Sequence, residues 1–369
     1  MKKIKILYVG LDKKPYIGGI ETFILKTVCN LNKEKYQVDF LCFKGDEPCY
    51  YEELVDVGSK FYFVTKRSEN YIKNIRETYK VLKENKFDII HCHLNSLSYI
   101  TPCIIGKKLN MQIILHAHNA GCLQGKKSII LHTLNKARIK NQKLTKIAVS
   151  KEAGEWFFGK NENVTVLYNG IEVDKFAFSQ LKRAEIRNEF GLADKKVIVN
   201  VGAFRKQKNH ERIVSIFADF LKEESNSILM LVGIGELQES IRHKVEELKI
   251  QNNVIFTGNR TDIDKILSAS DMFLFPSFYE GFPIALIEAE CSGLKCIISD
   301  CITEQSQVKE LCYPVSLKED NSVWVKALQQ CDQADRKDGA LLVEKSGFGI
   351  ESEIQQLENL YIELAKRRI

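Results

Sequence analysis

The chain has no long apolar run, no repeat and no strong excess of charge of either sign. No stretch approaches the eighteen or so consecutive apolar residues of a membrane-spanning helix, so we expect no segment to cross a bilayer. Lys and Arg exceed Asp and Glu by only 54 to 48, which does not indicate nucleic-acid binding. We also find no low-complexity tract. The sequence therefore predicts an ordinary globular protein.

Paired cysteine motifs are absent as well. The eleven cysteines form an odd set without a C-x-x-C pair, which argues against a disulfide framework and against a zinc site. Several lie in apolar runs, where cysteine behaves as a small hydrophobe, and this usage indicates a reducing cytosol. The charged start resembles a signal peptide, but its apolar run ends at Gly10, so we interpret it as a first strand.

The length and the alternation of short apolar runs with helical patterns predict two α/β domains. With 369 residues and 44% hydrophobic residues, the chain suits two domains of about 170 to 190 residues, each with a sizeable core. Runs that are apolar on both faces are typical of buried parallel strands. We expect a Rossmann-like domain over 1–174 and a second one over 175–350.

One stretch of the second half, 271–293, combines a strand, a loop and a helix. Met272–Phe275 is a short buried strand, and Pro283 suits a first helical position because its missing N–H would have no partner there. Gly293 suits the left-handed residue that ends the helix. Such a helix directs its free N–H groups into the crevice beyond a parallel strand, where phosphates bind. We therefore predict an anion site.

Two carboxylates lie beside this predicted anion site. Glu280 lies in the loop and Glu288 lies in the helix, roughly 7.5 Å along its axis from Pro283. Carboxylates repel phosphate but accept hydrogen bonds from hydroxyls, so the pair suits the ribose and the sugar at the two ends of a nucleotide sugar. The simpler alternative is one surface glutamate and one helix-face glutamate.

Basic residues follow the first strand of the second domain. The strand 195–202 leads into a loop with four basic or titratable side chains, Arg205, Lys206, Lys208 and His210. The loop is either solvated surface or a place where a diphosphate is held and stabilised as a leaving group. Asp262 and Asp264 lie further on as D-x-D, and we interpret them as a helix cap and a first-turn acid rather than as metal ligands.

Glycines and histidines mark the ends of strands in the first domain. Gly18 and Gly19 follow the first strand, where a plain tight turn is the alternative to a phosphate-facing loop. The runs 87–93 and 112–118 both end in histidine, and a histidine there points into the crevice. A functional role is predicted for His118, whereas His93 and His116 suit a structural role equally well. We expect no zinc site from the four histidines in these runs, because neighbouring strand residues face opposite sides.

The segment 126–146 carries positive charge without any acid. Its apolar side comprises Ile129, Ile130, Leu131, Leu134 and Ile139, and its basic residues are Lys126, Lys127, Lys136, Arg138, Lys140, Lys143 and Lys146. Two interpretations stay open. The segment is either a solvated helix whose apolar stripe packs on the core, or a basic face that contacts anionic lipid headgroups, worth about 1 kcal/mol per cation.

Several motifs resemble one known family. Glu280-Gly281-Phe282-Pro283 with Glu288 is similar to the E-x7-E motif of retaining glycosyltransferases of family 4, which have the GT-B fold of two Rossmann-like domains facing a cleft. Further family-like segments occur in family order from about residue 4 to residue 300. They are the Gly18-Gly19-x-Glu21 loop, His118, the Asn169-Gly170-Ile171 segment, Lys208 and the Asn259-Arg260 segment.

The resemblance implies roles for these positions. Lys208, with Arg205 and the N–H groups of Gly281, Phe282 and Ile284 at the helix entry around Pro283, would stabilise the departing diphosphate. Glu288 would accept from ribose, Glu280 from the donor sugar, and His118 would contact the sugar near the reacting carbon. The main chain at Asn259 and Arg260 would meet the base, and Gly18 and Gly19 the phosphates. The family's usual arginine is replaced by Ala203 here.

The resemblance also implies a reaction and its partners. It implies transfer of a hexosyl group from a nucleotide sugar, expected to be a UDP-sugar, with retention and without a metal or other cofactor. The acceptor would be a saccharide or a lipid-linked saccharide of capsule or exopolysaccharide synthesis, reached in the cytoplasm or on the inner membrane face. The C-terminal helix 351–369 would complete the first domain. A UDP-sugar 2-epimerase and a non-catalytic nucleotide-sugar-binding partner of another transferase are the alternatives.

Overall fold

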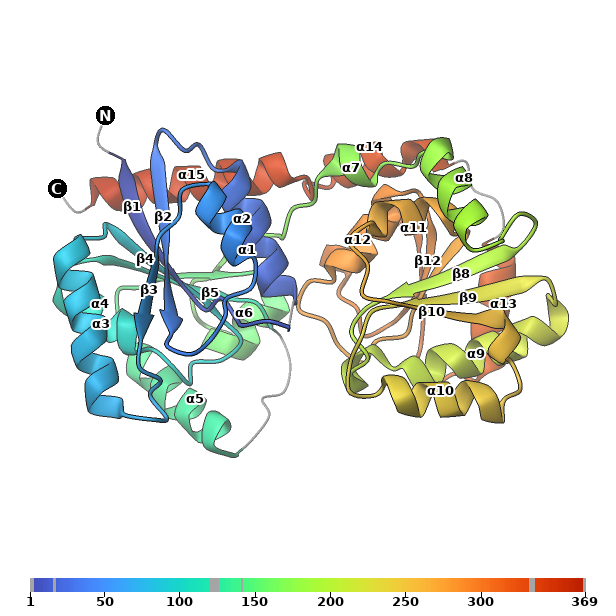
Figure 1. Ribbon diagram of the computed structural model, residues 1–369, viewed down its shortest axis with the longest axis horizontal. Helices are drawn as coiled ribbons and strands as arrows, with labels where there is room; N and C mark the ends of the chain where they lie inside the picture. The colour runs from blue at the N-terminus through green and yellow to red at the C-terminus, as the bar shows by residue number, and fades with distance from the viewer. Residues whose placement is uncertain (1–2, 16–17, 120–125, 141, 332–335, 368–369) are drawn as a thin grey trace. The chain divides into compact units, whose positions relative to one another are not determined.

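The computed structural model describes residues 3–15, 18–119, 126–140, 142–331 and 336–367. The chain forms two compact units (Figure 1). Unit 1 comprises Met1–Gly170 and Ile350–Ile369, and unit 2 comprises Ile171–Gly349. The division falls at Gly170, close to the expected residue 174. The prediction of two α/β domains with parallel sheets is confirmed.

Unit 1 contains a seven-stranded parallel sheet in the order β3-β2-β1-β4-β5-β6-β7. Its strands are β1 (Ile4–Val9), β2 (Tyr36–Phe43), β3 (Phe61–Val64), β4 (Ile89–Leu94), β5 (Gln112–Ala117), β6 (Thr145–Ala148) and β7 (Thr165–Val166). Its helices are α1 (Gly19–Asn30), α2 (Tyr51–Asp56), α3 (Tyr71–Asn85), α4 (Thr101–Lys108), α5 (Lys126–Ile139), α6 (Lys151–Phe158) and α15 (Ile350–Lys366).

Helices cover both faces of this sheet, which explains why its central strands are apolar on both sides. The core on one face joins Phe23 of α1 and Tyr361 of α15 to Tyr8 of β1. The expected cap of α6 is confirmed, because the Ser150 hydroxyl accepts from the Ala153 N–H at 3.1 Å.

Unit 2 contains a six-stranded parallel sheet in the order β10-β9-β8-β11-β12-β13. Its strands are β8 (Lys196–Val201), β9 (Ser227–Val232), β10 (Val254–Gly258), β11 (Met272–Phe275), β12 (Lys295–Ser299) and β13 (Cys312–Val315). Its α-helices are α7 (Val173–Phe176), α8 (Gln180–Glu189), α9 (His210–Glu223), α10 (Gln238–Glu247), α11 (Ile263–Ala269), α12 (Ile284–Cys291), α13 (Asn321–Gln330) and α14 (Gly339–Lys345). Short 3₁₀ turns are η1 (Lys206–Lys208), η2 (Gln251–Asn253), η3 (Glu304–Ser306) and η4 (Arg336–Asp338).

In each sheet, the direction in which successive strands are added reverses at one point. In unit 1 the order reverses between β1 and β4, and in unit 2 between β8 and β11. Ligands of doubly wound sheets bind beyond the carboxyl ends of the strands at such a point. Most predicted site residues follow these strands or the neighbouring β5, whereas Asn259 and Arg260 follow the edge strand β10. The two switch points are therefore where a site is expected.

The strand, loop and helix predicted over 271–293 form as β11 and α12. The helix begins at Ile284 with Pro283 as its N-cap, one position earlier than the first helical position expected for this proline. Gly293 has φ +71° and so takes the left-handed conformation expected after the helix. Within the described ranges, none of the helices is both long and apolar enough to cross a membrane.

Candidate functional site

Lys208 and Glu280 form the centre of the candidate site in unit 2. The Lys208 ammonium lies 2.8 Å from Glu280 Oε1, and their side chains are 17% and 8% exposed. Lys208 comes from the loop after β8, and Glu280 comes from the loop after β11. The structure thus brings together two of the predicted residues that are far apart in the sequence.

The stem of Lys208 is held by the main chain and by an aromatic ring. A Cβ added at Gly202 would lie 3.2 Å from Lys208 Cε and 3.3 Å from its Cδ. The ammonium lies 4.7 Å from the centre of the Phe275 ring, a favourable cation–π position. Gly202 therefore provides the space in which the lysine crosses the end of β8.

Gln207 and Asn209 tie the two loops together. The Gln207 amide donates to the Tyr279 carbonyl at 2.8 Å and to Glu280 Oε2 at 3.1 Å. The Asn209 amide donates to the Pro276 carbonyl at 3.0 Å. Both oxygens of Glu280 consequently have a partner, and its carboxylate is fixed in place. Sequence reasoning did not assign a role to Gln207, since nothing in one sequence shows which distant side chain an amide reaches.

The start of α12 lies directly after Glu280. The first-turn N–H groups of a helix have no partner within the helix, and the helix dipole makes this end positive. Glu288 lies one turn after Ile284 on this helix and is buried. The Phe282 ring packs edge-on against Phe348 with 5.5 Å between ring centres, so its side chain serves packing.

The other residues predicted in unit 2 take different positions. Arg205 and Asn259 are exposed. Arg260 pairs with Asp262 at 2.8 Å and with Glu189 at 2.9 Å, so its guanidinium is engaged within the unit and its main chain is the part left for a base. Asp262 is the N-cap residue of α11, as expected, although its side chain bonds Arg260 rather than the helix.

The predicted glycine loop of unit 1 leads into α1. Gly18 is the N-cap residue of this helix, and Gly19 is its first residue. The Gly18 N–H donates to Glu21 Oε2 at 2.8 Å, and Glu21 is buried, which raises the pKa of its carboxyl group. Glu21, the acidic residue of the Gly18-Gly19-x-Glu21 motif, thus occupies one N–H of the predicted phosphate-facing loop.

Four histidines meet on one face of the unit 1 sheet. His91 and His93 lie two residues apart on β4, and His116 and His118 lie two apart on and just beyond β5. The His91–His93 ring centres are 4.2 Å apart and those of His116–His118 are 4.0 Å apart. The expectation that these histidines cannot converge is wrong, because side chains two residues apart on a strand share a face.

Hydrogen bonds link the histidines in two groups. His91 Nε2 lies 3.3 Å from His116 Nδ1, and His91 Nδ1 lies 2.8 Å from the Tyr361 hydroxyl, which bonds the Tyr8 hydroxyl at 2.7 Å. His93 Nδ1 lies 3.1 Å from His118 Nε2. Burial lowers the pKa of His118 to about 3 and holds the pKa values of the other three well below their usual range, so all four rings are neutral.

Three of these histidines have the spacing of metal ligands. The ligand nitrogens of His91, His93 and His116 lie within 4.8 Å of one another, and within the described ranges this is the one such cluster found. It contains no carboxylate to offset the charge of a buried cation, and His91 and His116 already satisfy each other. The expectation that the site holds no metal stays a prediction.

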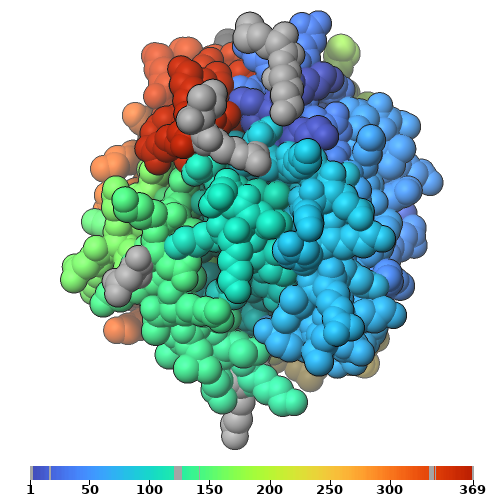
Figure 2. Space-filling model, turned by 90° about the vertical axis from the view of Figure 1, so that its left-hand side faces the viewer, coloured from blue at the N-terminus to red at the C-terminus, as the bar shows by residue number. Residues whose placement is uncertain are grey.

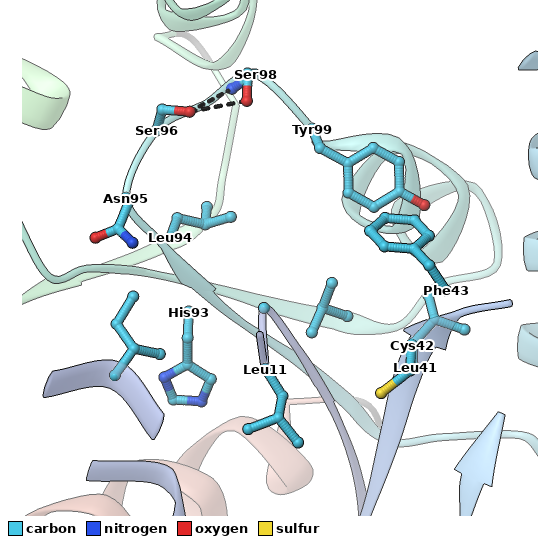
Figure 3. Close-up of a pocket in the computed structure, with 13 residues that line it drawn as sticks. Leu11, Leu41, Cys42, Phe43, His93, Leu94, Asn95, Ser96, Ser98 and Tyr99 are labelled. Atoms are coloured by element: carbon cyan, nitrogen blue, oxygen red, sulfur yellow. Dashed lines mark hydrogen bonds between the residues drawn. The ribbon is translucent and has the colours of Figure 1, made fainter. Parts of the chain in front are cut away.

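A cavity of about 200 Å³ opens beyond the carboxyl ends of β1, β2 and β4. Figure 3 shows His93 and Leu11 on one side of it and Ser96, Ser98 and Tyr99 on the other. Its walls combine apolar side chains with an amide and hydroxyls, among them a Ser96–Ser98 bond of 2.8 Å. Such a lining suits a neutral, hydroxyl-rich molecule about as large as one sugar ring.

The structure does not match the interpretation of the basic segment 126–146 as a solvated helix whose apolar stripe packs on the core. Ile129, Ile130 and Leu134 of α5 are 45%, 58% and 63% exposed, and the helix packs instead through Ile139 and His132. Figure 2 shows the outer face of unit 1, where the turquoise-green atoms of this segment lie at the surface. The exposed cations are Lys127, Arg138, Lys140 and Lys143, whereas Lys136 bonds the Trp156 carbonyl and Lys146 is buried against Glu162. The side chain of Lys126 lies outside the described part.

Comparison with known proteins identifies the family. The family model "Glycosyltransferase Family 4" matches residues 17–175, and "Glycosyl transferases group 1" matches residues 182–312, so the two models together span most of the chain. The chain belongs to glycosyltransferase family 4. It is a glycosyltransferase with the GT-B fold.

Similar proteins cover about four fifths or more of this glycosyltransferase. EpsF of Bacillus subtilis (strain 168) is 28% identical over 98% of this chain and 96% of its own. The Escherichia coli UDP-Gal:alpha-D-GlcNAc-diphosphoundecaprenol alpha-1,3-galactosyltransferase is 27% identical over 81% of this chain and 80% of its own. Among solved structures, HepE of Anabaena in complex with UDP and glucose has a TM-score of 0.79 at 16% identity, covering 98% of this chain and 100% of its own.

Proposed function

We propose that this glycosyltransferase transfers a hexosyl group from a UDP-sugar to a hydroxyl of a lipid-linked saccharide, with retention of configuration and without a metal ion. The observation that carries the proposal is the Lys208–Glu280 pair at the start of α12. It places a cation, free helix N–H groups and a carboxylate that can accept hydrogen bonds from hydroxyls within one small region. A nucleotide sugar offers the complementary diphosphate and hydroxyls.

Each residue has a role in this proposal. Lys208 and the helix N–H groups stabilise the departing diphosphate, with Arg205 supplying the charge that Ala203 lacks. Glu280 accepts from the donor sugar and Glu288 from the ribose. Gly18 and Gly19 face the phosphates, the main chain of Asn259 and Arg260 meets the base, and His118 contacts the sugar near the reacting carbon. The leaving phosphate itself takes the acceptor proton.

The donor and acceptor classes rest on the names of similar proteins. The Escherichia coli relative is named for a UDP-galactose donor and a diphosphoundecaprenol-linked acceptor, and HepE was crystallised with UDP and glucose. For the acceptor sugar, we propose the cavity beside His93, Asn95 and Ser96 in unit 1. A role in capsule or exopolysaccharide synthesis is part of the same proposal.

Product analysis tests the reaction. The protein is incubated with UDP-glucose, UDP-galactose or their N-acetyl forms and a diphosphoprenol-linked monosaccharide, with EDTA present. An α-linked disaccharide from an α-linked donor, identified by the NMR coupling of its anomeric proton, is the expected result. A β-linked product would contradict retention, and loss of transfer in EDTA that Mg²⁺ restores would contradict metal independence. Sugar inversion without acceptor would indicate the epimerase alternative.

A peripheral membrane contact through α5 would bring the protein to such an acceptor. Exposed Ile129, Ile130 and Leu134 can enter the headgroup region, while Lys127, Arg138 and Lys140 meet anionic lipid. We expect sedimentation with phosphatidylglycerol vesicles but not with phosphatidylcholine vesicles, and weaker binding for the Ile130→Ser, Leu134→Ser variant. The matched control replaces the exposed Leu181 of α8 with Ser. Equal binding of both variants would contradict the contact.

A further inference from the structure

The cavity of unit 1 has room for one sugar ring but not for the group to which that ring is linked. Its volume is about 200 Å³, and one wall is formed by Ser96, Ser98 and Tyr99 (Figure 3). In a saccharide that is joined to a lipid through a diphosphate, the first phosphorus atom is bonded to the anomeric oxygen of the ring. The phosphate of an acceptor bound in this cavity therefore lies at the edge of the cavity.

Arg67 lies beside this wall. It follows β3 at the carboxyl edge of the sheet, and its Nη1 donates to the Ser98 carbonyl. The guanidinium carbon lies 6.0 Å from the centre of the Tyr99 ring, at the outer limit of a cation–π contact. Arg67 is partly buried. Because both contacts are made with residues that line the cavity, the guanidinium is held next to the cavity.

Arg67 differs from the lysines at the same edge of the sheet, because it has no acidic partner. Lys66 pairs with Asp46 at 2.7 Å, and Lys44 pairs with Glu77 at 2.6 Å. Within the described ranges no carboxylate pairs with Arg67, and its bond to Ser98 occupies one of its five N–H donors. The other ion pairs at this edge are Lys13–Asp46 at 3.5 Å and Lys14–Glu47 at 2.7 Å.

A partly buried cation without a counter-ion suits the binding of an anion. Burial of a charge costs free energy, and an ion pair offsets this cost. The planar guanidinium presents its N–H groups as a fork that matches a phosphate, whereas the ammonium of a lysine acts as a point charge. The unused donors of Arg67 therefore fit one phosphate group beside the cavity.

We propose that Arg67 binds the phosphate next to the sugar ring of a diphosphate-linked saccharide whose ring occupies the cavity of unit 1. The inference rests on the proposed function for the lipid-linked acceptor and adds the group that recognises its diphosphate. A neutral glycoside of the same sugar fills the cavity equally well but leaves Arg67 without a partner. Arg67 thus makes the enzyme select acceptors that carry a phosphate, and all the residues involved belong to unit 1.

Two ligands that differ only in the diphosphate test the proposal in the full chain without catalysis. They are a diphosphoprenol-linked monosaccharide and the prenyl glycoside of the same sugar, compared by calorimetry for glucose, galactose and their N-acetyl forms. For the sugar that binds best, we expect the diphosphate to raise the affinity roughly ten- to a hundredfold, the contribution of a hydrogen bond to a charged group. Arg67→Met keeps the apolar stem without the charge and is expected to abolish this preference while binding the neutral glycoside normally. A preference that persists in Arg67→Met would overturn the proposal.

Two further variants separate a phosphate contact from the general charge of the edge. Lys66→Met removes the neighbouring cation, and Asp46 still has Lys13 as a partner, so the preference is expected to stay within about threefold of the wild type. Arg67→Lys keeps the charge without the fork and is expected to retain part of the preference. Equal losses in Lys66→Met and Arg67→Met would overturn the proposal. So would an Arg67→Met protein that binds both ligands equally weakly, because Arg67 would then only hold the Ser98 loop in place.

UDP and anionic lipid headgroups are the other phosphates that the protein is proposed to meet. We expect the affinity for UDP and the sedimentation with phosphatidylglycerol vesicles to be the same for the wild type and Arg67→Met, since Lys208 and α5 make those contacts in the proposed function. If Arg67→Met weakens UDP or vesicle binding and keeps the preference for the diphosphate-linked ligand, Arg67 binds a different phosphate and the proposal is wrong.

Transfer assays distinguish this inference from the proposed function. We expect Arg67→Met to raise the KM for the diphosphate-linked acceptor roughly tenfold or more, with the KM for the donor unchanged. If the wild type transfers only to the diphosphate-linked acceptor and Arg67→Met does so equally well, the proposed function stands and the role of Arg67 is wrong. If the wild type uses the neutral glycoside equally well, or binds none of the diphosphate-linked sugars, the proposed acceptor class is wrong and this inference is overturned with it.

Discussion

In the ligand-free protein, Lys208 and Glu280 satisfy each other. An ammonium has three donors, so Lys208 can keep Glu280 at 2.8 Å while it binds a phosphate oxygen. The pair is mostly shielded from solvent, which strengthens both interactions relative to surface charges. The site is therefore arranged before a donor arrives.

Replacing Lys208 by Ala tests the proposed phosphate contact. We expect the affinity for UDP, measured by calorimetry, to fall by roughly ten- to a hundredfold, the loss of one hydrogen bond to a charged group. Lys206→Ala is the matched control, because Lys206 lies on the same loop and is exposed. Equal losses for the two variants would mean that only the general positive charge of the loop matters.

Replacing Gly202 by Ala tests the position of the lysine stem. The added Cβ would lie 3.2 Å from Lys208 Cε, so the stem must move. We expect UDP to bind about fivefold more weakly, a cost of about 1 kcal/mol. In Lys208→Ala the same substitution is expected to have no further effect. Additive losses in the double variant would show that Gly202 acts through some other contact.

Sequence patterns indicated some of these residues and not others. Lys208, Glu280 and Glu288 follow motifs of fixed spacing, so the sequence indicates them even without their partners. The hydrogen bond from Gln207 to Glu280 and the pairing of Arg260 with Glu189 were not predicted, because these contacts join segments far apart in the chain. The histidine cluster was misjudged for a different reason, since the two-residue period of a strand places His91 and His93 on one face.

At the scale of elements, hydrogen bonds between buried polar groups attach α15 to the rest of unit 1. Glu353 accepts from the Thr27 hydroxyl at 2.7 Å and from the Gly170 N–H at 2.6 Å, and Tyr361 bonds Tyr8 and His91. Burial raises the pKa of Glu353 to about 8. At neutral pH the carboxyl group is therefore mainly protonated, and it can then donate to Thr27 while still accepting from Gly170.

This pKa predicts a pH dependence of stability. Because the folded pKa of Glu353 is raised above that of the unfolded chain, its contribution is fully present below about pH 4.5 and is lost as pH rises through about 8. Glu353→Gln keeps the neutral hydrogen bonds at every pH. Denaturant unfolding is expected to show similar stability for both proteins near pH 4 and a variant more stable by about 1 kcal/mol or more near pH 9. Parallel curves would contradict a protonated Glu353.

The helix α5 shows the limit of periodicity as a guide. Its apolar residues have helical spacing, yet Ile130 and Leu134 face solvent, while Ile139 and polar groups make the contacts with the unit. His132 accepts from the Leu97 N–H at 3.2 Å, and Asn135 donates to the Leu97 carbonyl at 2.7 Å. Hydrogen bonds to main-chain groups of a distant loop fix the orientation of the helix, and sequence spacing does not reveal them.

At the scale of the whole molecule, each unit has its own hydrophobic core. Tyr361 lies in the core of unit 1, and Trp324 lies in the core of unit 2. The central strands were predictable because parallel strands that are buried on both faces form apolar runs. The region after Asp300 was not, because β13 is a short edge strand containing Pro314, and the buried face of α13 is limited to Trp324, Val325 and Leu328.

Separate cores predict separate effects of core substitutions. Tyr361→Ala is expected to cost about 3 to 5 kcal/mol in unit 1, and Trp324→Ala a similar amount in unit 2. In scanning calorimetry each variant should lower the midpoint of a different transition by several degrees. A single transition that both substitutions shift equally would show that the two units unfold together.

The most direct test of the central claim is the release of nucleotide from a panel of nucleotide sugars. Each donor is incubated with the wild type, with Lys208→Ala and with Glu280→Ala, and free UDP or GDP is measured with and without acceptor. The account predicts release from one UDP-sugar, accelerated by the acceptor and lost in both variants. Release that persists in both variants, or no nucleotide release from any donor together with no UDP binding in calorimetry, would contradict the assignment of the site.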